Sequence, residues 1–115
     1  MIWQQLQEAI GNPDARVIVR TASAIAELPG PLPLRAGEWI TLGTEGQPHL
    51  HVRAADAAAL TLHAPDDANV ALELVDGAGA RILRVAFVRT NPAKPECDHA
   101  RRAALVARFG GPVGA

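Results

Sequence analysis

The chain has 115 residues, of which 49% are hydrophobic and 20% are charged, and a formal net charge of −1; this size and composition predict one globular domain over residues 1–115 and argue against a disordered chain. The small net charge argues against a nucleic-acid binder that works by neutralising phosphates, and no apolar run approaches the about 18 residues of a membrane span. The single Cys97 cannot form an internal disulfide and the first residues lack the pattern of a signal peptide, so we expect a cytoplasmic protein.

A short helix is predicted at the start of the chain. Trp3, Leu6 and Ile10 recur at spacings of three and four residues, which gives residues 2–10 one apolar stripe. The turn residues Gly11-Asn12-Pro13-Asp14 end this helix. Because an isolated helix of this length is marginal in water, we expect it to pack against the rest of the domain.

From Arg16 onwards the apolar pattern is typical of β-strands that follow one another with no helix between them. The predicted strands are Arg16–Arg20, Ala24–Leu28, Glu38–Leu42, His49–Arg53, Ala58–His63, Val70–Asp76 and Ala80–Arg89. Pro29-Gly-Pro-Leu-Pro33 interrupts them as a rigid loop or sheet edge, and the glycines of Asp76–Gly79 allow a hairpin between the last two strands. Both faces of Ala80–Arg89 are mostly apolar, so we expect this strand to be central and covered on each side.

A second helix is predicted over Glu96–Phe109, where Ala, Leu and Arg are good helix formers. Gly110-Gly-Pro ends it, and Val113–Ala115 follows as a frayed tail. With no helix between strands, parallel crossover connections are not expected. The predicted fold class is therefore α+β, an antiparallel meander sheet of about seven strands with one helix at each terminus.

Two histidines in the strand His49–Arg53 are the nearest approach to a chemical site. Residues i and i+2 of a strand point to the same face, so His49 and His51 are predicted to lie side by side. Neutral imidazole nitrogens ligate haem iron or another metal ion. Two histidines alone do not complete a zinc site, which takes four protein ligands, or three and a water. The alternative is two polar residues on an exposed sheet face.

Several pieces of residues 16–89 occur in an order that resembles one protein family. The pieces are paired strands over Val17–Leu28, the turn Gly30-Pro31-Leu32-Pro33, the strand Trp39–Leu42, the strand His51-Val52-Arg53 after a glycine turn, Leu60-Thr61-Leu62 after an Ala-rich segment, and a hairpin over Val70–Val88 around Asp76 and Gly79. In this order the chain is similar to the intracellular haem-utilisation carriers of the ChuX/HutX type, which are related to each half of the larger HemS-type proteins. The chain departs from that family in lacking most of its N-terminal helical region and in having no tyrosine to ligate iron.

The resemblance implies a haem carrier that captures haem in an apolar cleft beside the sheet, with two copies pairing like the halves of a HemS-type protein. A histidine would ligate the iron, with His51 or His49 the first choice and His99 the second. Arginines would hold the propionates, and a tryptophan would stack on the porphyrin. The candidate cofactor-binding residues are His51, His49, Arg53, Arg84, Trp39 and His99, with His51 and His49 as metal ligands.

Two other functions stay open. A member of the same fold that binds no haem would act as a small-ligand or protein-interaction module. The absence of tyrosine and the shortened N-terminal region favour this alternative. An enzyme that reduces or degrades haem needs an open coordination position on the iron and an electron source, and the sequence gives no sign of either. The chain has no P-loop, no dinucleotide-binding glycine motif, no G-x-S-x-G and no H-E-x-x-H, so a binding protein is favoured over an enzyme.

Overall fold

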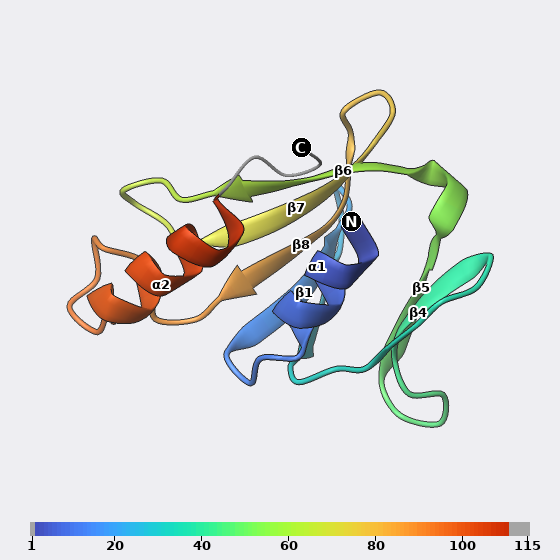
Figure 1. The fold of residues 1–115 in the computed structure, drawn as a ribbon, viewed down its shortest axis with the longest axis horizontal. Helices are drawn as coiled ribbons and strands as arrows, with labels where there is room; N and C mark the ends of the chain where they lie inside the picture. Colours follow the sequence, from blue (N-terminus) through green and yellow to red (C-terminus); the bar gives the residue numbers. More distant parts are fainter. Residues whose placement is uncertain (1, 111–115) are drawn as a thin grey trace.

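The computed structural model describes residues 2–110, and the predicted tail Val113–Ala115 lies outside them. Its elements in chain order are α1 (Ile2–Ile10), β1 (Ala15–Arg20), β2 (Ile25–Pro29), β3 (Leu34–Arg35), β4 (Trp39–Gly43), β5 (His49–Arg53), the 3-10 turn η1 (Ala54–Asp56), β6 (Ala57–His63), β7 (Ala71–Asp76), β8 (Arg81–Phe87) and α2 (His99–Phe109). The predicted α+β class, with one helix at each end of antiparallel strands, is confirmed (Figure 1).

The strands divide into two antiparallel sheets. The larger has five strands in the order β2-β1-β8-β7-β6, and the smaller has three in the order β3-β4-β5. Strand β8 lies at the centre of the larger sheet, as its two apolar faces predicted. The smaller sheet begins with β3, which the sequence did not indicate because it covers only two residues, Leu34–Arg35. Prolines 29, 31 and 33 precede it and offer no backbone N–H to a longer ladder.

The apolar core lies between one face of the larger sheet, the two helices and the inner face of the smaller sheet (Figure 1). Strand β8 contributes Phe87, whose ring stacks on that of Phe109 in α2 at 6.1 Å between centroids. Both helices pack on this face of β8, whereas on its other face Ala86 is buried and Ile82 and Arg84 are half-buried. The expected cover is therefore complete on one face of the strand and partial on the other.

Two arginines fix α2 to the rest of the chain. The helix begins at His99, later than predicted, because the Asp98 carboxylate caps it by accepting from the backbone N–H of Arg101 at 2.9 Å. The Arg101 guanidinium donates to Asp14, beyond the end of α1, at 2.8 Å and 3.1 Å. Arg102 donates to four backbone carbonyls, those of Ala64, Pro65, Ala68 and Thr90. The helix end is thus positioned by directional bonds as well as by apolar packing.

Candidate functional site

Three cross-strand pairs place most of the predicted site residues on the outer face of the smaller sheet. Trp39 lies opposite Arg53, Thr41 opposite His51 and Gly43 opposite His49. The alternate residues Ile40, Leu42 and Val52 turn inward to the core. We refer to the six outward residues of these pairs as the histidine face.

The two imidazoles of the histidine face lie side by side, as their spacing predicted. Their ring centroids are 5.0 Å apart, with 75° between the ring planes. Nδ1 of His49 lies 2.6 Å from the carbonyl oxygen of Gln47. Because a carbonyl oxygen only accepts, Nδ1 carries the hydrogen and Nε2 of the neutral ring keeps its lone pair. Metal-binding histidines are held in this way, with one nitrogen anchored and the other free for the metal.

Nδ1 of His51 is 3.0 Å from the hydroxyl of Thr41, its partner across the sheet. Thr41 is 3% exposed, so its hydroxyl is held in place by burial. A hydroxyl can both donate and accept, and the hydrogen bond is compatible with either tautomer of His51. The sequence did not single out Thr41. The hairpin register, which sets it opposite His51, is the signal that would have found it.

Gly43 makes room for His49. Its φ of +99° is in the left-handed region that favours glycine, and a Cβ placed there would lie 2.9 Å from Cβ of His49 and 2.7 Å from the carbonyl oxygen of Pro48. Any side chain at residue 43 would therefore push against the Pro48 carbonyl and the Cα and Cβ atoms of His49. A glycine facing a histidine across the hairpin is the sequence feature that marks this constraint.

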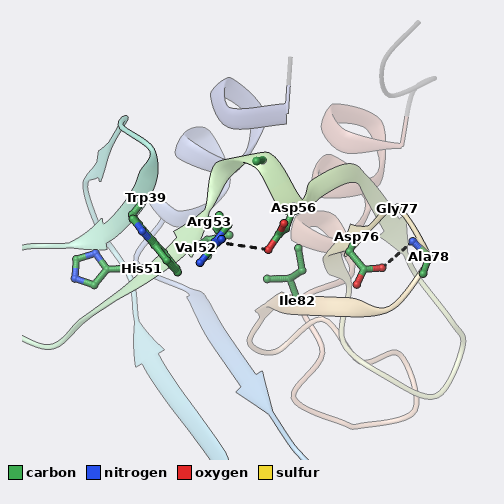
Figure 2. Close-up of a pocket in the computed structure, with 10 residues that line it drawn as sticks. Trp39, His51, Val52, Arg53, Asp56, Asp76, Gly77, Ala78 and Ile82 are labelled. Carbon is green, nitrogen blue, oxygen red and sulfur yellow. Dashed lines mark hydrogen bonds and ion pairs between the residues drawn. The ribbon is translucent and has the colours of Figure 1, made fainter.

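At the other end of the face, Arg53 stacks on Trp39 (Figure 2), with its Cζ 4.8 Å from the ring centroid. Its Nε lies 4.0 Å from the Asp56 carboxylate, and both side chains are more than half exposed. Trp39 is itself 48% exposed, which is unusual for so large an apolar side chain. An exposed aromatic ring with a guanidinium fixed on it can contact both a flat apolar ligand and a carboxylate.

A cleft of about 770 Å³ opens between this end of the smaller sheet and the β7–β8 hairpin (Figure 2). It is lined by Trp39, His51, Val52, Arg53, Ala55, Asp56, Asp76, Gly77, Ala78 and Ile82. Asp76 serves the hairpin turn, as the sequence indicated, because one of its carboxylate oxygens accepts from the N–H groups of Ala78 and Ala80. The contribution of this distant hairpin to the cleft could not be foreseen from local sequence patterns.

Two predicted residues lie away from the histidine face. Arg84 is on β8, and its Nε is buried with no hydrogen-bond partner in the described part of the chain. Glu73, which faces Arg84 in the register, pairs instead with Arg81 at 2.8 Å and His63 at 3.0 Å. His99 starts α2, which lies across the molecule from β4 and β5 (Figure 1). The structure therefore brings His49, His51, Arg53 and Trp39 together and leaves Arg84 and His99 apart.

Within residues 2–110, no cluster of three or more His, Cys, Asp or Glu side chains is arranged to hold a metal ion. No helix in the same range is long and apolar enough to cross a membrane.

The comparisons with known proteins give structural matches alone. No family model matches the sequence, and no curated protein does. The crystal structure of ChuX superposes with a TM-score of 0.65 at 15% identity, covering 96% of this chain and 73% of that one. A protein from Erwinia carotovora superposes with a TM-score of 0.66 at 18% identity, covering 94% of this chain and 70% of the other. The chain has the ChuX fold.

This result confirms the fold implied by the order of motifs between residues 16 and 89. Because 96% of the chain superposes on ChuX, the likeness to the ChuX fold extends beyond those motifs to the regions of α1 and α2. At such low identities it concerns the fold, and the chemistry has to be argued from the residues themselves.

Proposed function

We propose that this protein is a haem-binding protein of haem utilisation, a cytoplasmic carrier that holds haem against the histidine face and the adjoining cleft. One observation carries the proposal: an imidazole with a free Nε2 lies on the same face as a guanidinium stacked on an exposed indole. Together these groups offer an iron ligand, a carboxylate contact and a flat apolar surface. The ChuX fold on which they stand supports the same conclusion.

The iron ligand is one of the two adjacent histidines. Both rings have Nδ1 in a hydrogen bond, which orients the ring and leaves Nε2 as the ligating atom. His49 has the better defined tautomer because its partner is a carbonyl oxygen, which only accepts. His51 is the more exposed of the two and lines the cleft, so it is the more accessible to a large ligand.

The propionates would bind at Arg53, whose guanidinium is more than half exposed and can take a carboxylate bidentately. Asp56 competes for the same guanidinium at 4.0 Å, but an exposed pair of this kind contributes little and exchanges readily. Asp56 and Asp76 both line the cleft and repel carboxylates, so the propionates would point toward Arg53 and the porphyrin would lie against Trp39.

A hemin titration of the purified protein tests the proposal. We expect a saturable Soret band with one haem per chain or per dimer. Sedimentation of the loaded protein, compared with this stoichiometry, shows whether the chain is a monomer or a dimer. The band should shift in His49→Ala or His51→Ala. The control His63→Ala should leave it unchanged, because His63 is paired with Glu73 in the larger sheet.

Two outcomes would contradict this proposal in different ways. A band that forms but is unaltered in both His49→Ala and His51→Ala would show that the ligand lies elsewhere. No saturable band at all would exclude the carrier function and favour a small-ligand or protein-interaction module on the same fold.

A further inference from the structure

We infer that His49 and His51 also form a chelating site for a divalent transition-metal ion, with Cu²⁺ bound more tightly than Ni²⁺ or Zn²⁺. The inference does not rest on haem binding, because it uses the two imidazoles alone. Their centroids are 5.0 Å apart on one strand face, and a hydrogen bond at Nδ1 orients each ring. Two neutral imidazoles fixed next to each other offer two nitrogen ligands to one ion.

The hydrogen bonds determine which nitrogens bind. In His49 the carbonyl of Gln47 keeps the hydrogen on Nδ1, so Nε2 is the free ligand. In His51 the buried hydroxyl of Thr41 can accept from Nδ1, and this tautomer frees Nε2 as well. Metal binding selects this tautomer without breaking the hydrogen bond. The Gln47 carbonyl and the Thr41 hydroxyl thus orient the two rings, as hydrogen-bond partners of ligating histidines do in metalloproteins.

The spacing of the rings suits a shared ion. Metal–nitrogen bonds of about 2.0–2.1 Å at a tetrahedral or right angle place the two nitrogens roughly 3 Å apart. Rings with centroids 5.0 Å apart have to rotate about their side-chain bonds to bring their Nε2 atoms to this separation. Each rotation also moves Nδ1, so it has to stay small enough to keep the Nδ1 hydrogen bonds to Gln47 and Thr41.

Only two protein ligands are available, because no third His, Cys, Asp or Glu joins them in the part of the chain that the structure describes. Water or an added ligand has to fill the remaining positions, so the site is open and of modest affinity. Imidazole ligands suit Cu²⁺, Ni²⁺ and Zn²⁺, and the general order of stability places Cu²⁺ first.

Both proposals use the histidine pair, and Arg53 distinguishes them by its charge. It lies two residues beyond His51 on the same face, and its positive charge opposes a cation while it attracts a carboxylate. The substitution Arg53→Gln is therefore expected to strengthen Cu²⁺ binding by about twofold to fivefold. The same substitution should weaken hemin binding, so the two proposals can fail independently.

The test is a titration of the full chain with Cu²⁺ in the absence of haem, followed by calorimetry and electron paramagnetic resonance. We expect one ion per chain with two imidazole nitrogens in its spectrum. His49→Gln and His51→Gln should each weaken binding by at least about tenfold. The matched controls are His63→Gln and the double variant Cys97→Ser/His99→Gln, which remove the histidines outside the pair and should leave the affinity unchanged.

Three results would overturn the inference. They are an affinity that survives either of the two single substitutions, a spectrum with one imidazole nitrogen, and a loss of binding confined to the Cys97/His99 variant. Circular dichroism checks that each variant is folded, which we expect because neither histidine belongs to the core.

Discussion

The two sheets of this protein differ in what they bury and in what they expose. The larger sheet pairs β8 on both sides and packs its Phe87 face against both helices. The smaller sheet buries Ile40, Leu42 and Val52 on its inner face but exposes Trp39, His51 and Arg53 on the other. We therefore expect stability to depend mainly on the larger sheet and the proposed ligand binding on the smaller. Substitutions in each should therefore have separable effects.

The largest effect is expected for Phe87→Ala, in the centre of the larger sheet. Phe87 is fully buried and stacked on Phe109, so its truncation leaves a cavity and should lower the free energy of unfolding by about 3–5 kcal/mol. Urea denaturation measures this loss. Molecules that remain folded should bind hemin with unchanged affinity. A parallel loss of affinity would mean that the two sheets are coupled.

Gly43→Ala tests whether a change confined to the smaller sheet also destabilises the protein. The positive φ and the contact with His49 should together cost about 2–3 kcal/mol and displace the imidazole. Gly46→Ala is the matched control, because Gly46 has a similar φ of +87° but nothing within 4 Å of an added Cβ. We expect the control to lose about 1 kcal/mol and to retain hemin and Cu²⁺ binding. Equal ligand affinities in the two variants would show that Gly43 does not position His49.

Arg102→Ala examines the directional bonds that hold α2. Four backbone carbonyls would lose their charged donor, and the free energy of unfolding should fall by about 2 kcal/mol. Thermal unfolding followed by circular dichroism measures the change. Arg102→Lys keeps the charge but not the planar fork, so it should restore only part of the stability. Full restoration by lysine would indicate that charge alone is responsible.

The smallest change in stability is expected for Trp39→Ala, which tests the exposed face of the smaller sheet and not its core. Since the indole is 48% exposed, its removal should cost about 1–1.5 kcal/mol of unfolding free energy, roughly half the value for a fully buried side chain. Hemin affinity should nevertheless fall by roughly tenfold, because the flat surface and the support for Arg53 are both lost. Fluorescence quenching is unsuitable in this variant, so the Soret band is the readout. A large stability loss with unchanged hemin affinity would assign Trp39 to the fold instead.

Most of the strands could be predicted because alternating apolar residues indicate strands without reference to their partners. The hairpin at Asp76–Gly79 and the central place of β8 also follow from local chemistry. The division into two sheets does not. It depends on β1 pairing with β8 across most of the chain, and on the short β3 beside the prolines. Pairings so distant in sequence are decided by burial in the folded protein, which no local pattern records.

The histidine pair could be foreseen because a strand has a period of two residues. The stacking of Arg53 on Trp39 could have been inferred from the hairpin register that sets them opposite each other. The cleft could not, since Asp76, Gly77 and Ala78 come to it from another hairpin. The haem and metal sites stay proposals that the titrations decide.

The modest size of the smaller sheet has a consequence for its motions. It is joined to the rest of the chain by the link between β2 and β3 and by η1, and its edge strand β3 has only two residues. Segments with few pairing partners open locally at a lower free energy than the whole domain. Amide hydrogens of β4 and β5 should therefore exchange with deuterium sooner than those of β8. A large ligand could then enter where the smaller sheet opens, while the larger sheet and its core stay folded.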